Sequence, residues 1–223
     1  MTFRLKTLLA LATIASLTAC TGLSSTKTVS QEPPVTRWDH RPEGKVWTQK
    51  TLLAVASEDA ELAASVPADI ALWCPSYPEA SIEDRRAFWV GLMSAVAKHE
   101  STWNPKASGG GGRWIGLLQI SPGTAKQYGC DATSSAALKD GVANLSCAVE
   151  ILSVQVGRDN AVAGNGAQGM GRDWAPFRSA SKRAEMAAWT SAQPYCVKGG
   201  STKTVNLGNF GQGIALPRSP SAS

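Results

Sequence analysis

Apolar residues recur at helical spacing through the middle of the chain. One stripe consists of Phe88, Leu92 and Val96, and Trp89 and Met93 widen it. Residues four positions apart lie on the same face of a helix, so this stripe predicts a helix with one buried face. Strict alternation of apolar and polar residues, which is typical of strands, is scarce. The chain is therefore predicted to be mainly α, with at most a minor β element.

Capping residues indicate where two of the predicted helices begin. Ser81 and Asp84 have the spacing of a capping box before the stripe of Phe88. Ser121-Pro122 combines a cap with a proline in the first turn, which predicts a short helix that ends at Gly129.

Two more helices are predicted in the second half of the chain. Asp140 is expected to cap a long helix that ends at Gly157. Its apolar face consists of Val142, Leu145, Val149, Leu152 and Val156. A last helix is predicted over Ser181–Ala192.

Composition divides the chain into one central domain and two flexible flanks. Residues 20–45 are rich in Ser, Thr, Pro and charge, which is typical of a tether. Residues 198–223 are rich in Gly, Ser and Pro and form a predicted flexible tail. Residues 46–197 are numerous enough for a single domain with a sizeable core.

Residues 1–19 have the pattern of an export signal. Arg4 and Lys6 precede the apolar run Leu8–Leu17, which is too short to span a bilayer. The run ends in Leu17-Thr18-Ala19-Cys20, which resembles the lipobox of bacterial lipoproteins.

The lipobox resemblance implies that Cys20 becomes a lipid-modified N-terminus and anchors the protein in the cell envelope. Thr21 stands where an aspartate would favour the inner membrane, which implies the periplasmic face of the outer membrane. The alternative is a soluble secreted protein in which Cys20 is cleaved away or pairs as a thiol.

The net charge is +5, and residues 1–19 carry two positive charges and no negative one, so the remaining chain carries +3. This mild charge fits attraction to a polyanionic cell wall. It does not indicate nucleic-acid binding, which needs a dense basic surface. No particular protein partner is indicated.

Four cysteines remain after the signal, and an even number in an exported chain predicts two disulfides. Three connectivities are possible. We expect the local pair Cys130–Cys147, and the pair Cys74–Cys196, which would join the start of the domain to its end. The spacing argues against a zinc site. With only two histidines, His40 and His99, no metal or other cofactor is expected.

Glu100 continues the apolar stripe at the C-terminal end of its helix. Burial and the negative end of the helix dipole both favour the protonated carboxyl, which suits a general acid. The alternative is a frayed last turn with Glu100 in water.

The residues after Glu100 strengthen the first interpretation. Asn104-Pro105 predicts a turn, and Gly109–Gly112 would let a ligand approach the backbone closely. Ser101 could orient the carboxyl. Gln119 could offer its amide to a sugar or to Glu100, or be satisfied by nearby backbone. Trp103 and Trp114 could stack on sugars, and core packing is as good an interpretation for both.

Two motifs together resemble the lysozyme-like domain of lytic transglycosylases of the soluble-transglycosylase (SLT) type, a fold shared with goose-type lysozyme. They are Glu100-Ser101-x-Trp103-Asn104-Pro105 and Gly116-Leu117-Leu118-Gln119-Ile120, followed by Pro122-x-Thr124-Ala125-x-x-Tyr128-Gly129. The resemblance implies cleavage of peptidoglycan between N-acetylmuramic acid and N-acetylglucosamine, with a 1,6-anhydromuramic product. It implies Glu100 as the single acid and base, with Ser101 and Gln119 beside it.

The chain departs from the family pattern at two places. The family's serine nine residues after the glutamate is Gly109 here, and Ser108 lies one position earlier. The family's Ala-Tyr-Asn segment is missing, and Trp174 is the aromatic residue in that region. Ser108 and Trp174 are therefore candidate substrate contacts.

Two alternatives to a transglycosylase remain open at this stage. One is a muramidase that admits water in place of the 6-hydroxyl group. The other is a non-catalytic peptidoglycan-binding lipoprotein that retains the fold.

Replacing Cys20 by alanine (Cys20→Ala) is expected to leave an unlipidated precursor, because the thiol that would carry the lipid is missing. Metabolic labelling with a palmitate analogue measures this directly. Label that still marks the variant would contradict the lipobox interpretation.

Overall fold

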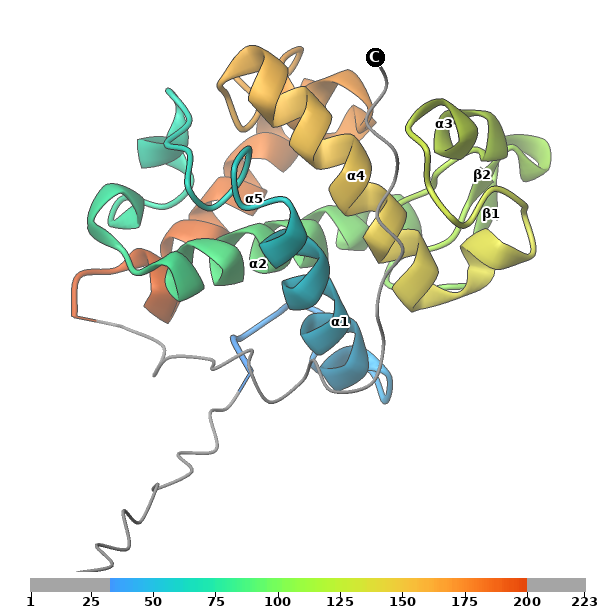
Figure 1. Ribbon diagram of the computed structural model, residues 1–223, viewed down its shortest axis with the longest axis horizontal. Coiled ribbons are helices and arrows are strands. Elements are labelled where there is room, and N and C mark those ends of the chain that lie inside the picture. The colour runs from blue at the N-terminus through green and yellow to red at the C-terminus, as the bar shows by residue number, and fades with distance from the viewer. Residues whose placement is uncertain (1–32, 200–223) are drawn as a thin grey trace, which may run out of the picture. The chain divides into compact units, whose positions relative to one another are not determined.

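The computed structural model describes residues 33–199, which form five α-helices and one two-stranded sheet (Figure 1). The helices are α1 (Gly44–Ser57), α2 (Ile82–Ser101), α3 (Pro122–Gln127), α4 (Gly141–Asp159) and α5 (Ala180–Ser191), and the strands are β1 (Ser108–Gly109) and β2 (Trp114–Ile115). This confirms the mainly α class with a minor β element. The predicted signal peptide, Cys20, the first part of the tether and the tail beyond residue 199 lie outside the described residues.

Helix α2 is the centre of the fold. Every residue from Ala87 to Ala97 is buried. Helix α2 runs across the middle of the molecule behind α1 and α4, with α5 packed along it (Figure 1). The prediction of a single buried face was therefore wrong, because a helix surrounded by other elements is apolar on all sides.

The predicted N-terminal caps are confirmed. The Ser81 side chain accepts a hydrogen bond from the Asp84 amide at 3.1 Å, and Ser121 accepts one from the Thr124 amide at 3.0 Å. Asp140 caps α4 by accepting from the Ala143 amide at 2.9 Å.

The predicted bounds of two helices need correction. Helix α4 continues past Gly157 and ends before Asn160, which adopts a left-handed φ of 46°. A Cβ at Gly157 would lie 3.1 Å from Cγ of Glu61, so the glycine permits close packing inside the helix and does not end it. Helix α5 begins and ends one residue earlier than predicted.

The segment 33–43, predicted to be part of the tether, belongs to the folded domain. Trp38 is fully buried, and its ring packs edge-on against Trp47 of α1 at 5.9 Å. Its Nε1 donates a hydrogen bond to Oγ1 of Thr48 at 2.8 Å. Helix α1, which the sequence pattern did not predict, is fixed in part by these contacts.

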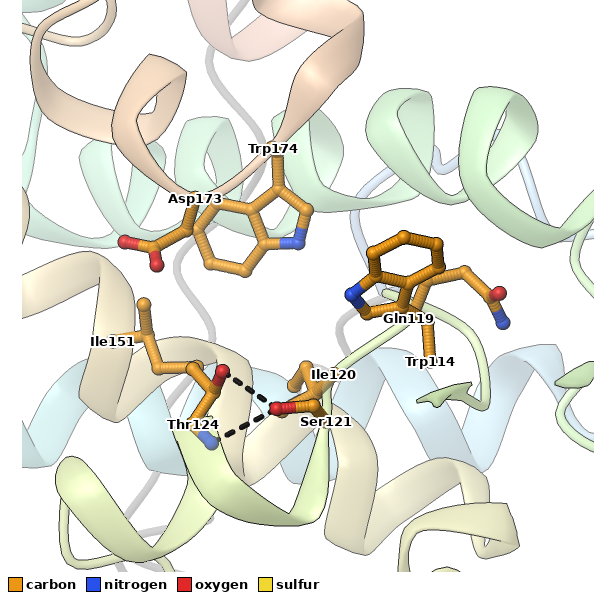
Figure 2. A pocket seen from close by; sticks show the side chains of 8 residues that line it. All are labelled: Trp114, Gln119, Ile120, Ser121, Thr124, Ile151, Asp173 and Trp174. Atoms are coloured by element: carbon orange, nitrogen blue, oxygen red, sulfur yellow. Dashed lines mark hydrogen bonds between the residues drawn. The ribbon is translucent and has the colours of Figure 1, made fainter. Parts of the chain in front are cut away.

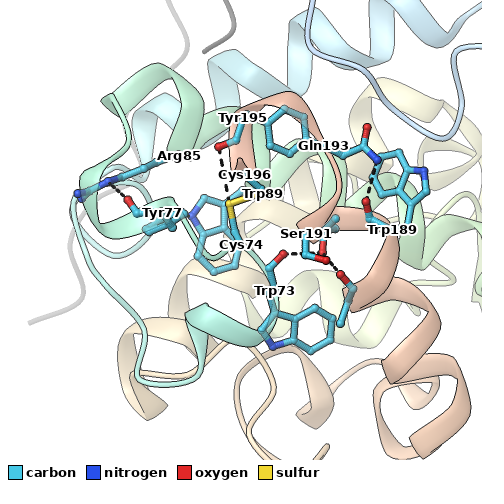
Figure 3. Close-up of a disulfide and its surroundings, with 12 residues drawn as sticks. Trp73, Cys74, Tyr77, Arg85, Trp89, Trp189, Ser191, Gln193, Tyr195 and Cys196 are labelled. Carbon is cyan, nitrogen blue, oxygen red and sulfur yellow. Dashed lines mark hydrogen bonds between the residues drawn. A yellow bond between two sulfur atoms is a disulfide. The ribbon is translucent and has the colours of Figure 1, made fainter. Parts of the chain in front are cut away.

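Both predicted disulfides are present. Cys130–Cys147 joins residues 17 positions apart, and Cys74–Cys196 joins residues 122 positions apart. Figure 3 shows the longer-range bond beside the aromatic side chains of Trp89 and Tyr195. In the part of the chain that the structure describes, no helix has the length and apolar character needed to cross a membrane.

The two disulfides are expected to differ in their contribution to stability. All four cysteines are buried, so the length of the closed loop decides the order. Chain entropy predicts about 3 kcal/mol for a loop of about 15 residues and about 4.7 kcal/mol for one of about 100. In urea unfolding, the double variant Cys74→Ala/Cys196→Ala should therefore lose more free energy of unfolding than Cys130→Ala/Cys147→Ala. The opposite order would contradict the loop-length argument.

Candidate functional site

Glu100 lies in the last turn of α2, where the chain makes a sharp turn. The two residues beyond the helix, Thr102 and Trp103, have left-handed φ values of 52° and 55°. Such conformations cost about 1–3 kcal/mol each for residues other than glycine, and they cluster at functional sites.

The turn is held by hydrogen bonds back to α2. The amides of Thr102 and Trp103 both donate to the carbonyl of Ala97. The indole Nε1 of Trp103 donates to the carbonyl of Ser94 at 2.9 Å, and the ring of His40 packs edge-on against it at 4.7 Å. Trp103 therefore packs on the domain to hold the turn, as the core-packing interpretation predicted.

The carboxyl group of Glu100 is half-buried and accepts no hydrogen bond from the residues that the structure describes. Burial raises the pKa of Glu100 from 4.5 to about 7, against the opposing effect of Lys182 and Arg178. Burial was one of the two causes predicted from the sequence. At a pKa near 7 both protonation states are populated around neutral pH, which suits a group that donates and then accepts a proton.

The glycine run forms the tip of the β1–β2 hairpin. Ser108 pairs with Ile115, and Gly109 pairs with Trp114. A Cβ at Gly109 would lie 2.5 Å from Oε1 of Gln119, so the glycine leaves room for that side chain. The next three residues, Gly110–Gly112, have positive φ values of 55°, 67° and 92° that favour glycine.

Asn144 of α4 fixes the segment after the hairpin. Its Nδ2 donates to the carbonyls of Ile115 (2.9 Å) and Leu138 (3.0 Å), and its Oδ1 accepts from the amide of Leu118 at 2.9 Å. Gly116 has a φ of 79°, and a Cβ there would lie 2.4 Å from Nδ2 of Asn144. The glycine of the Gly-Leu-Leu-Gln motif is thus required by the packing of Asn144.

The predicted neighbours of Glu100 have other partners. Oγ of Ser101 donates to the carbonyl of Ala97 at 3.3 Å, so Ser101 does not orient the carboxyl. Nε2 of Gln119 donates to the carbonyl of Gly116 at 2.9 Å, which is the backbone alternative. Ser108 is exposed on β1.

A pocket of about 290 Å³ lies beside this segment (Figure 2). Its lining residues are Trp114, Gln119, Ile120, Ser121, Thr124, Ile151, Asp173 and Trp174. In Figure 2, Asp173 and Trp174 lie on one side, with the hydrogen-bonded pair Ser121 and Thr124 opposite. The structure thus brings Gln119 and Trp174 together, whereas Glu100, Ser101 and Ser108 do not line this pocket.

Two of the pocket residues, Trp174 and Trp114, were candidates from the sequence, and Asp173 was not. Trp174 is buried and donates from Nε1 to the carbonyl of Leu118 at 3.0 Å. The side chain of Trp114 is 45% exposed and available to a ligand. Asp173, which the sequence did not single out, is held by Nε2 of Gln155 at 2.5 Å and by the hydroxyl of Tyr128 at 3.4 Å.

Within residues 33–199 no three potential metal ligands gather at one place.

Residues 79–186 match the family described as Transglycosylase SLT domain. This stretch, a little under half of the chain, is similar to the SLT domain. All of the motifs that resembled this family fall within the matched range, which also includes Asp173 and Trp174.

Solved structures of the protein DslA share the fold of this chain. The wild-type protein in its second form has a TM-score of 0.67 and 29% identity. Two variants, each with one glutamate-to-glutamine substitution, have TM-scores of 0.68 and 0.67 with 29% and 28% identity. Each match covers 74% of this chain and 100% of DslA. No curated protein resembles this chain closely enough to count as a match.

The lysozyme-like fold predicted from the motifs is therefore confirmed. The similarity to the SLT domain indicates a lytic-transglycosylase-type function on peptidoglycan.

The raised pKa of Glu100 predicts a pH-dependent effect of Glu100→Gln on stability. Between pH 4.5 and about 7 the folded protein binds more protons at this group than the unfolded chain does, so its contribution to the free energy of unfolding falls as pH rises. Glutamine removes that loss. In urea unfolding the variant should equal the wild type at pH 4 and exceed it at pH 8, by up to about 3 kcal/mol. A difference that is the same at both pH values would contradict the raised pKa.

Proposed function

We propose that this protein is a lytic transglycosylase that cleaves the β-1,4 bond between N-acetylmuramic acid and N-acetylglucosamine and leaves a 1,6-anhydromuramic end. Glu100 is the single acid and base of the reaction. The observation that carries the proposal is a half-buried carboxyl with a pKa of about 7 and no hydrogen-bond partner among the described residues, at the end of α2 in an SLT domain.

The proposed reaction needs one proton carrier. Glu100 donates its proton to the glycosidic oxygen as the bond from that oxygen to C1 of the muramyl residue breaks. The 6-hydroxyl oxygen of the same residue then bonds to C1 and gives its proton to the Glu100 carboxylate. No water is consumed, and Glu100 returns to its protonated state. The acetamido group of the substrate stabilises the anomeric centre in between.

Two cationic side chains support the intermediate stage. Once Glu100 has given up its proton it is an anion in a half-buried position. Lys182 and Arg178 act on it with the opposite charge, which favours the carboxylate. Burial favours the acid and these cations favour the base, so one group serves both steps.

The pocket of Figure 2 supplies a surface for an adjoining part of the glycan strand. Sugar-binding pockets combine apolar surface with a few fixed polar groups. Trp114 offers the exposed apolar ring here, and Asp173 and Ser121 offer the polar groups.

A muramidase is the second candidate, with Asp173 as the second carboxylate to be tested. Glycosidases that use water generally need a second carboxylate, and Asp173 is a carboxylate in the pocket. Between residues 98 and 127 the chain has no acidic residue other than Glu100. The end group of the product distinguishes the two reactions, because hydrolysis leaves a reducing end.

We also propose that the protein acts at the periplasmic face of the outer membrane, held by lipid on Cys20. The support for this location is the lipobox in the sequence.

Glu100→Gln is expected to lower turnover by at least about 10³–10⁴-fold, because glutamine keeps the shape but transfers no proton. The purified variant should still sediment with peptidoglycan sacculi, since the pocket is unchanged. Mass spectrometry of the released fragments measures both the amount and the end group.

Asp173→Asn is the matched comparison. In the proposed reaction it weakens binding but leaves the products with anhydro ends. Reducing ends from the wild type that disappear in Asp173→Asn would replace the proposal with a muramidase. If Glu100→Gln retained more than about a tenth of wild-type turnover, Glu100 would not be the catalyst. A wild-type protein that binds sacculi and releases nothing would be the non-catalytic wall-binding lipoprotein.

A further inference from the structure

One carboxylate on α5 gathers three basic side chains. Oε1 of Glu185 lies 2.8 Å from Nζ of Lys98 and 2.6 Å from a guanidinium nitrogen of Arg37. Its Oε2 lies 2.9 Å from Nε2 of His99. The Glu185 side chain is 37% exposed, whereas those of Arg37 and His99 are 13% and 15% exposed.

Two of these partners are the residues that immediately precede Glu100. Lys98 and His99 belong to the last turn of α2, and Glu185 belongs to the middle of α5. The ion pairs therefore tie the turn that carries Glu100 to a neighbouring helix. Arg37 adds a tie to the segment before α1, where its amide also donates to Oγ of Ser94 at 2.9 Å.

Helices α2 and α5 run in opposite directions along this contact. A Cβ at Gly91 would lie 3.5 Å from the ring of Trp189, Lys98 pairs with Glu185, and Lys182 acts on Glu100. Residues 182, 185 and 189 lie on one face of α5 because they are three and four positions apart. This face of α5 thus carries two charged residues, Glu185 and Lys182. Lys182 is the one that acts on Glu100.

The charged side chains that act on Glu100 directly are both positive: Lys182 of α5 and Arg178, which precedes α5. Lys98 and His99 precede Glu100 in the last turn of α2. Arg37 faces the same cluster from the N-terminal segment. Among the described residues, Glu185 is the carboxylate that pairs with Lys98, His99 and Arg37. Without it, the positive charges of Lys98 and Arg37 would have no counterion within this cluster.

We propose that Glu185 is a positioning residue for Glu100: it holds the last turn of α2 against α5, and it neutralises the basic side chains beside the catalytic carboxyl. This role rests on the proposed acid–base function of Glu100, but its electrostatic part is measurable without activity. Loss of the negative charge favours the Glu100 carboxylate and reduces the protonated fraction at neutral pH.

The direct test is the titration of Glu100 by carboxyl ¹³C NMR, with the signal assigned by its loss in Glu100→Gln. Glu185→Gln should lower the midpoint of that titration by about 0.5–1 pH unit, because a nearby negative charge is removed. Glu185→Asp keeps the charge and should stay close to the wild-type midpoint. In the turnover assay, the upper pH limit of activity should fall with the midpoint in Glu185→Gln.

Asp59→Asn is the matched control for the loss of an ion pair on α2. Asp59 accepts from Nε of Arg86 at 2.9 Å, and Arg86 lies 14 positions before Glu100, or about 21 Å along the helix. This variant should lose stability without a change in the Glu100 midpoint. An unchanged or raised midpoint in Glu185→Gln, or an equal shift in Asp59→Asn, would overturn the proposal.

A second variant covers the case in which Glu185→Gln does not fold. Lys98→Gln removes a positive charge and leaves Glu185 in place, so the midpoint should rise. A midpoint that stays or falls would also overturn the proposal. Because the titration is read without substrate, these outcomes are separate from a failure of the proposed function, which would appear as no fragment release by the wild type.

Discussion

The burial of α2 on all sides is the constraint on which the rest of the structure depends. From Ala87 to Ala97 the helix has no face in contact with solvent, so its neighbours must cover it completely. Beyond this buried stretch the helix becomes partly exposed again at its last turn, where Glu100 is half-buried. The same packing that forms the core therefore places one carboxyl at the edge between protein and solvent, where its pKa is raised without the full cost of burying a charge.

The features predicted correctly from the sequence are those that depend on local chemistry. The caps Ser81, Ser121 and Asp140 act within three residues, and the two disulfides join the expected cysteines. The segment 33–43 was assigned wrongly because its burial depends on Trp38 meeting α1, a contact that no local pattern reveals. The end of α4 was misplaced for a similar reason, since Gly157 serves the packing of Glu61.

The motif residues of the candidate site divide in the same way. The burial and raised pKa of Glu100 could be predicted because both follow from its place at the end of an apolar helix. The roles of Ser101 and Gln119 could not, because each side chain had several possible partners and the structure pairs each of them with a backbone carbonyl. Gly116 leaves room for Asn144, which lies 28 positions later and holds Ile115 and Leu118 on either side of the glycine by hydrogen bonds. Packing therefore explains this motif residue.

In the proposed reaction, the charge distribution around Glu100 explains how a single carboxyl serves two opposite proton transfers. Burial alone would favour the acid and leave a poor base, and cations alone would favour the base and leave a poor acid. Here Lys182 and Arg178 lower the pKa of Glu100, which burial raises. Glu185 forms ion pairs with Lys98 and Arg37. Lys182 and Glu185 belong to α5, and Arg178 lies just before it. In the proposed reaction, the balance between acid and base at Glu100 therefore depends on α5 and the turn before it.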